Sequence, residues 1–293
     1  MKNIELVYFV YPSCDGGCEH CWSSDMLMGR HKTLEWHCKV IDKLAQMNTY
    51  SLIKLSGGEP FKNKDLGKIA KEIHKRISKD IPIQIFTSGR PFVSTKGGQE
   101  GVLETKKMLE SYFSNYDNIS IQLSVDEYHL KVLKRLHSSK TNAEDLVYNY
   151  IQNFMQACFV LMKEHPGFLG PKLKIHCEEG HLELHKKLFS WFPEEWWKEY
   201  VILTEGLVYA GNAKRLERTF KIQPSNMLSY FLMPGVDFFE KPQTKRALEF
   251  SNQENNIYLD DMENSAVLIH GWWNLINREA EYTSIYLDEK IYV

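Results

Sequence analysis

The chain has 293 residues, 43% of them hydrophobic and 25% charged, which is enough for a substantial core in one α/β unit with an extension. Its 36 basic and 38 acidic residues leave a net charge of −2, so no general electrostatic attraction to nucleic acid is expected. No stretch approaches the roughly 18 consecutive apolar residues of a membrane span. The N-terminal sequence lacks the features of a signal peptide, and the six cysteines do not require disulfides, so we expect a cytoplasmic protein with available thiols.

A buried strand is expected over residues 4–10, and a cysteine-rich loop follows it over residues 11–25. In this loop Cys14, Cys18 and Cys21 have C-x3-C-x2-C spacing. Soft thiolates prefer zinc, copper(I) or iron–sulfur clusters to hard, oxygen-binding cations. A structural zinc site needs four ligands, and complete iron–sulfur ligation normally uses four cysteines. Three cysteines leave one coordination position open, which is typical of a reactive metal centre.

Other roles for the thiols stay open at this point. The three cysteines of the loop could be buried, or His20 or His31 could complete a mononuclear zinc site of the Cys3His type. Cys38 and Cys158 fall on apolar faces of expected helices, where packing in the core is the better explanation.

Beyond the loop, apolar residues alternate between helical and strand spacing. Helices are expected over residues 34–45, 66–77, 102–113 and 143–163. Strands are expected over residues 52–55, 81–86, 119–123, 173–177 and 200–203. Thr33 is placed to cap the first helix, and residues 95–100 are expected to form a solvent loop. This alternation predicts parallel strands with right-handed crossovers, in a barrel or a doubly wound open sheet, with the active site at the carboxyl ends of the strands.

Glycines and a carboxylate follow the second of these strands. Gly57 and Gly58 would let the backbone approach a ligand closely, and Glu59 offers a carboxylate to an ammonium group. An ordinary strand-to-helix turn is the alternative.

Short polar side chains stand at the ends of later strands. Ser88, Ser124 and Asp126 would face the same mouth, where they suit either ligand contact or helix capping. His129 could act as an acid or base toward a substrate, but a solvent or capping role is favoured.

The cysteine loop and the glycine segment together resemble the radical S-adenosylmethionine (SAM) enzymes. The hallmark of that family is a C-x3-C-x-aromatic-C loop after the first barrel strand, and His20 takes the aromatic place here. Residues 55–60, LSGGEP, match the family's GGEP segment. The resemblance implies a partial (β/α)6, TIM-like barrel over residues 1–213. Residues 214–293 would be a C-terminal extension that closes the barrel or lines the substrate pocket.

The resemblance also implies two cofactors. Cys14, Cys18 and Cys21 would hold a 4Fe-4S cluster whose fourth iron is chelated by SAM. The GGEP segment would bind the methionine amino group, while a T-S-G turn and an S-x-D segment would contact other parts of SAM. The implied cofactor-binding residues are Gly57, Gly58, Glu59, Pro60, Ser88, Ser124, Asp126 and His20.

The implied reaction starts with an electron from an external donor such as flavodoxin or ferredoxin. SAM then breaks into methionine and a 5′-deoxyadenosyl radical, which abstracts hydrogen from a substrate. A ribosomally made peptide is the favoured substrate, because peptide maturases use this compact format. A small metabolite or nucleotide, activation of a glycyl-radical partner, and a catalytically silent metal-binding protein are the alternatives.

One further thiol lies at a strand end. Cys177 is near the end of the fifth expected strand, where it could donate a hydrogen atom to a substrate radical, as a peptide epimerase would need. A role as a small core residue is the alternative.

Overall fold

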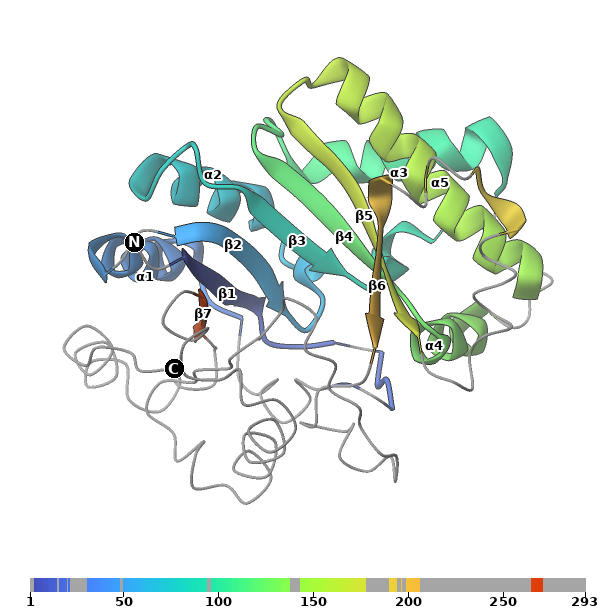
Figure 1. Ribbon diagram of the computed structural model, residues 1–293, viewed down its shortest axis with the longest axis horizontal. Helices are drawn as coiled ribbons and strands as arrows, with labels where there is room; N and C mark the ends of the chain where they lie inside the picture. The colour runs from blue at the N-terminus through green and yellow to red at the C-terminus, as the bar shows by residue number, and fades with distance from the viewer. Residues whose placement is uncertain are drawn as a thin grey trace.

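The computed structural model describes residues 3–14, 16–19, 21, 31–47, 50–93, 96–137, 143–177, 190–193, 196, 199–205 and 265–270. Within them, seven strands form one sheet in the spatial order β6-β5-β4-β3-β2-β1-β7, and all neighbouring strands are parallel (Figure 1). The strands are β1 (Asn3–Tyr11), β2 (Tyr50–Gly57), β3 (Ile83–Thr87), β4 (Ile119–Val125), β5 (Phe168–Cys177), β6 (Val201–Glu205) and β7 (Ser265–His270).

The first six strands lie side by side in the order in which the chain makes them. A doubly wound sheet would instead reverse its order at a switch point between strands. The structure therefore confirms the predicted α/β class and agrees with a partial TIM-like barrel rather than with the open-sheet alternative.

Five α-helices connect the strands in the described part of the chain. They are α1 (Leu34–Met47), α2 (Leu66–Arg76), α3 (Gly98–Tyr112), α4 (Glu127–His137) and α5 (Ala143–Glu164). Short 3₁₀ helices also follow β2 and β3, over Pro60–Lys62 and Arg90–Phe92. Thr33 caps α1 as expected, because its hydroxyl oxygen accepts a hydrogen bond from the backbone N–H of Trp36 at 3.3 Å.

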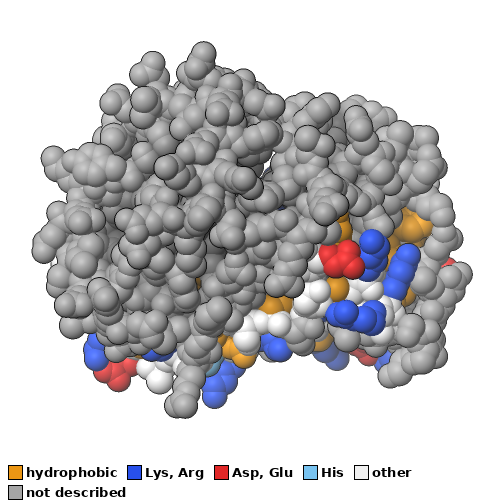
Figure 2. Space-filling view, turned by 90° about the horizontal axis from the view of Figure 1, so that it is seen from below, with side chains coloured by type: hydrophobic (Ala, Val, Ile, Leu, Met, Phe, Trp, Pro, Cys, Tyr) orange, Lys and Arg blue, Asp and Glu red, His pale blue; other side chains and the backbone are white. Residues whose placement is uncertain are grey.

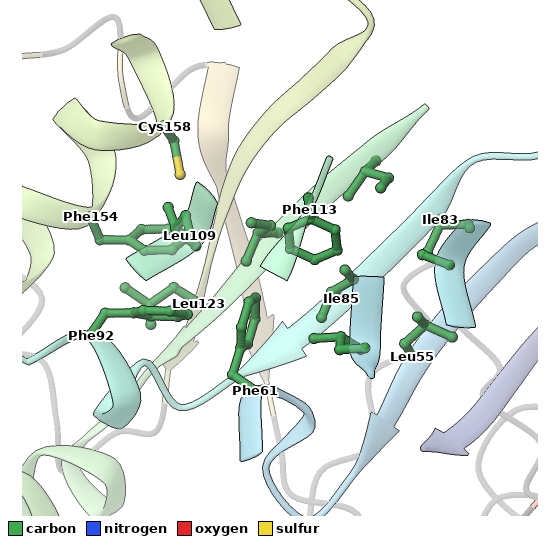
Figure 3. Close-up of a cluster of buried hydrophobic side chains, with 14 of the residues drawn as sticks. Leu55, Phe61, Ile83, Ile85, Phe92, Leu109, Phe113, Leu123, Phe154 and Cys158 are labelled. Carbon is green, nitrogen blue, oxygen red and sulfur yellow. The ribbon is translucent and has the colours of Figure 1, made fainter. Parts of the chain in front are cut away.

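The main hydrophobic core lies between the helices and one face of the sheet. Figure 3 shows Leu123 beside Leu109 of α3 and Phe154 of α5, while Ile85 and Leu55 lie farther along the same layer of buried side chains. These five side chains are fully buried. Burial of one such side chain stabilises the fold by about 1.5–3 kcal/mol, so this layer fixes how the strand ends are placed.

The opposite face of the sheet carries polar side chains on β2 and β4 beside apolar ones, Val7 and Phe9, on β1. Side chains alternate along a strand, so Lys54 of β2 and Gln122 of β4 point away from the helix-covered core, and each is only 4% exposed. Lys174 of β5 is partly buried. Its own burial, and then the ammonium of Lys54, lower the pKa of Lys174, while Asp126 opposes this effect. This face, called the inner face below, thus carries two lysines whose charges repel one another. Barrel interiors are more often filled by branched apolar side chains.

Three features differ from the sequence expectations. Helix α3 begins at Gly98, so the expected solvent loop over residues 95–100 is wrong in its second half. Helix α4 was not predicted; it begins directly after Asp126, which caps it. Strand β7 was not predicted either, and it pairs with β1 although it belongs to the expected extension, residues 214–293.

Among the described residues, no helix combines the length and the apolar character needed to cross a bilayer. In the part of the surface that is described in Figure 2, basic and acidic side chains lie next to one another, in keeping with the net charge of −2.

Replacing Phe154 by Ala should lower the free energy of unfolding by about 3–5 kcal/mol, because it opens a cavity in the main core. Urea unfolding followed by circular dichroism measures this loss. Leu103→Ala is the matched control, since Leu103 is 54% exposed on α3 and should change stability by less than about 0.5 kcal/mol. Equal losses in the two variants would contradict this account of the core.

Candidate functional site

The cysteine loop begins where β1 ends. Cys14 and Cys21 are half-buried, and Cys18 is only 6% exposed. The backbone N–H of Cys21 donates to the carbonyl of Cys18 at 3.2 Å, which closes a tight turn between these two residues. The loop therefore bends back on itself at the carboxyl end of the first strand, where the sequence predicted the site.

The three thiols affect one another electrostatically. Burial, together with the charges of Cys14, Cys21 and Asp126, raises the pKa of Cys18 to about 12, and Arg90 opposes this effect. Negative charge on one sulfur thus disfavours charge on the others. A bound cationic group would remove this mutual repulsion, as thiolate ligation requires.

No group of three or more His, Cys, Asp or Glu side chains within the described residues is placed to hold a single metal ion. His31 instead makes a 3.1 Å hydrogen bond with Asn63 and stacks at a tilt on Tyr11. The zinc alternative that uses His31 therefore finds no support among these residues, and His20 lies outside them. A cluster makes a different demand, because each of its irons takes its own ligand and the sulfurs need not meet at one point.

The GGEP segment lies directly against the cysteine loop. Gly58 N donates to the carbonyl of Tyr11 at 2.8 Å, and Glu59 N donates to the carbonyl of Ser13 at 3.1 Å. A Cβ on Gly58 would stand 1.9 Å from the Ser13 oxygen, and one on Gly57, whose φ is +119°, would stand 2.4 Å from the Tyr11 oxygen. The glycines thus allow the two loops to meet backbone to backbone, a close approach that the sequence analysis assigned to a ligand.

The carboxylate of Glu59 joins this segment to the turn after β3. Glu59 is 1% exposed. Its oxygens accept hydrogen bonds from Thr87 Oγ1 at 2.7 Å, and from the Ser88 hydroxyl and backbone N–H at 2.6 and 3.0 Å. It also accepts a longer bond, 3.4 Å, from the N–H of Phe61 in the 3₁₀ helix that Pro60 begins. Glu59 and Ser88, two predicted site residues, are therefore in direct contact.

Asp126 caps α4. Its two carboxylate oxygens bond to the backbone N–H of His129 at 2.8 Å and to the His129 ring Nδ1 at 2.6 Å. The structure thus gives the cap to Asp126, as a structural task besides any ligand contact, and makes His129 the residue that is capped. Ser124, two residues earlier, is half-buried at the end of β4.

The remaining cysteines have different surroundings. Cys158 is fully buried in the core, as expected, whereas Cys38 is half-buried, and its partial burial and the carboxylate of Glu72 raise its pKa. Cys177 is the last residue of β5, paired in register with Glu205 of β6; its side chain lies outside the description, so its role stays a prediction.

Sequence reasoning missed three residues that hold the site together. Asn63 is fully buried and donates from its amide to the Val10 carbonyl at 2.8 Å, which fixes the end of β1. Arg90 contacts Cys14, and Arg135 donates to the Gly16 carbonyl at 2.8 Å. Asn63 and Arg90 each lie within three residues of a recognised motif, and this closeness was the one feature of the sequence that could have pointed to them.

Replacing Gly58 by Ala should displace the cysteine loop, because the new Cβ would overlap the Ser13 carbonyl. We expect faster reaction of Cys18 with a thiol reagent and a loss of most iron uptake on anaerobic reconstitution. Ser13→Ala is the control, since it keeps the carbonyl and alters only an exposed side chain. Unchanged thiol reactivity and iron content in Gly58→Ala would refute this contact.

Comparison with known proteins agrees with these motifs. The sequence matches the radical SAM superfamily over residues 8–155, about half of the chain. A search of curated proteins gave no match. Among solved structures, the chain is similar to native anSMEcpe with bound AdoMet and Cp18Cys peptide, at 14% identity and a TM-score of 0.43, over 69% of this chain and 51% of that one.

Two other solved structures show the same level of similarity. Streptococcus suis SuiB is 15% identical with a TM-score of 0.43, over 92% of this chain and 50% of that one. Coproporphyrinogen III oxidase (HemN) from Escherichia coli, described as a radical SAM enzyme, is 12% identical with a TM-score of 0.41, over 92% and 63% of the two chains. The chain spans about half the length of anSMEcpe and SuiB. By its match over residues 8–155, the chain belongs to the radical SAM superfamily of enzymes.

Proposed function

We propose that Cys14, Cys18 and Cys21 hold a 4Fe-4S cluster and that the chain catalyses reductive cleavage of SAM. When bound, the two cofactors supply a one-electron cleavage that gives methionine and a 5′-deoxyadenosyl radical able to abstract hydrogen from a substrate. The donor set fits this group, because one loop presents three soft sulfurs and leaves a ligand position for SAM.

The observation that carries the proposal is the hydrogen-bonded junction of three loops. The loops after β1, β2 and β3 each contain a motif that the sequence assigned to the site. The main chain of Gly58 and Glu59 bonds to the first loop, and the carboxylate of Glu59 bonds to the third. This junction lies at the carboxyl ends of parallel strands, where barrel enzymes have their active sites, and so supports the proposal.

Different residues of the junction would bind different parts of SAM. Backbone groups of Gly57 to Pro60 and the charge of Glu59 suit the ammonium of the methionyl part, while Ser88, Ser124 and Asp126 offer hydroxyl and carboxylate oxygens to the rest. His20 would complete the cluster loop. Because Glu59 already bonds to Thr87 and Ser88, its orientation is set before any ligand arrives, which lowers the entropy cost of binding.

We propose a peptide as the substrate, with flavodoxin or ferredoxin as the electron donor. Polar side chains on the inner face support a peptide, since Lys54, Gln122 and Lys174 can bond to carbonyl and carboxylate groups that every peptide carries. Cys177, at the end of β5 on the same sheet, is proposed as the hydrogen-atom donor. The extension over residues 214–293 would line this substrate site.

Replacing Cys18 by Ala should abolish both cluster binding and SAM cleavage. Iron content and 5′-deoxyadenosine, the latter by mass spectrometry after anaerobic addition of dithionite and SAM, measure the two losses. Cys38→Ala is the control because Cys38 lies on α1 outside the loop, and it should retain both. Retention of cluster and cleavage by Cys18→Ala would refute the assignment of the cluster ligands.

Replacing Glu59 by Gln should weaken SAM binding about tenfold or more while the cluster stays bound. Gln keeps the shape and one acceptor oxygen for the junction but loses the charge that an ammonium prefers, and a hydrogen bond to a charged group contributes about 1.5–3 kcal/mol. Anaerobic calorimetry measures the affinity, and the melting temperature checks the junction. Equal affinity in the variant and the wild type would refute the ammonium role of Glu59.

The substrate class has its own test. A precursor peptide encoded beside the gene should raise the rate of 5′-deoxyadenosine formation, and deuterium from a labelled residue should appear in that product. Stimulation by a nucleotide or a small metabolite, with none by the peptide, would overturn the peptide proposal but leave the cleavage reaction standing.

A further inference from the structure

Arg90 occupies a fixed position between two of the motif loops. It begins the 3₁₀ helix that follows the turn Thr87-Ser88-Gly89. Gly89 has a φ of +71°, and a Cβ there would stand 2.1 Å from the Tyr150 hydroxyl, which donates a hydrogen bond to the Ser88 carbonyl. The turn is thereby held against α5, so the base of the arginine side chain cannot shift freely.

The guanidinium of Arg90 makes polar contacts with both of these loops. Its Nε donates to the Ser88 hydroxyl at 3.1 Å, and one terminal nitrogen lies 2.7 Å from the sulfur of Cys14. Gly16 leaves the space that the group fills, because a Cβ at Gly16 would stand 3.0 Å from the guanidinium carbon. The planar fork thus faces a proposed cluster ligand with one edge and the turn after β3 with the other.

We propose that Arg90 is a positioning residue that raises the reduction potential of the cluster by donating a charged hydrogen bond to the sulfur of Cys14. The proposal rests on the function proposed above. Taking up one electron adds a negative charge to the cluster and its thiolates. A cation at hydrogen-bond distance from one of those sulfurs stabilises the reduced state more than the oxidised one. Hydrogen bonds to ligating sulfurs are a recognised means by which proteins set such potentials.

Arg135 provides an internal comparison on the same loop. Its terminal nitrogen donates to the backbone carbonyl of Gly16 at 2.8 Å, so the acceptor is a main-chain oxygen and not a cysteine sulfur. Loss of Arg135 removes a tether of the loop while the contact with Cys14 remains. Variants of the two arginines can therefore be compared: loss of Arg135 reports the effect of tethering the loop, and loss of Arg90 reports the direct effect on a ligand sulfur.

The test is a redox titration of the reconstituted full chain, followed by electron paramagnetic resonance, for the wild type, Arg90→Gln, Arg90→Lys and Arg135→Gln. In Arg90→Gln the ratio of reduced to oxidised cluster at the wild-type midpoint should fall about tenfold, which is a shift of about −59 mV for a one-electron couple. Arg90→Lys keeps the charge but not the fork, so its shift should be smaller and of the same sign. Arg135→Gln should keep the wild-type midpoint.

Each outcome decides the proposal. A wild-type midpoint in Arg90→Gln, at full iron content, overturns it, and so does a shift of equal size in Arg135→Gln. Where Arg90→Gln fails to take up the cluster, Arg90→Lys is decisive: a negative shift supports the proposal and a wild-type midpoint overturns it. Failure of both Arg90 variants to bind iron also overturns it, because the arginine would then serve assembly and not the potential. A wild type without a cluster signal would refute the proposed function itself.

Discussion

The arrangement of the loops at the carboxyl ends of the strands depends on the hydrogen bonds of one buried carboxylate, that of Glu59. Removing a charged group from water costs several kcal/mol unless hydrogen bonds replace its hydration. Here Thr87 and Ser88 provide three of those bonds, and Phe61 a fourth. Because the bonds come from the turn after β3, the carboxylate is satisfied only when that turn and the GGEP segment are both in place. The junction is therefore selective for one arrangement of the loops.

The junction in turn depends on the two-sided character of the sheet. The apolar residues of β2, β3 and β4 pack under α3 and α5 and hold the strands in register, so that their ends reach the same edge (Figure 3). Several of the residues between them, such as Lys54 and Gln122, carry polar groups toward the inner face. In β2, for example, Leu55 packs in the core and stabilises the fold, while the neighbouring Lys54 lies on the inner face. The division lets the inner face change its chemistry without disturbing the core.

Much of this architecture could be predicted from the sequence because it is encoded by local patterns. Periodic apolar residues gave the first six strands and four of the helices, and fixed spacings gave the cysteine loop and the GGEP segment. Contacts between distant residues carry no such pattern. Arg90 and Cys14 are 76 positions apart, and Asn63 and Val10 are 53 apart, so only the folded chain brings them together. Strand β7 escaped prediction for the same reason, since its partner β1 is at the other end of the sequence.

Asp126 shows a second limit of sequence reasoning. A short carboxylate after a strand can cap a helix or meet a ligand, and the residue type is the same for both tasks. The bonds to His129 identify the cap. Helix α4, which starts at the residue after the cap and spans Glu127–His137, went unpredicted along with it.

The backbone bonds from Gly58 and Glu59 to the loop after β1 also order the events of folding. Their acceptors, Tyr11 and Ser13, precede the donors by more than forty positions in the chain. The cysteine loop therefore acquires its shape late, after β2 has docked beside β1, and closing such long-range contacts is slow compared with forming a helix. A nascent chain would present three flexible thiols during this interval. Cluster delivery timed to follow docking of β2 would meet a shaped loop and would leave the thiols exposed to oxidants for the shortest time.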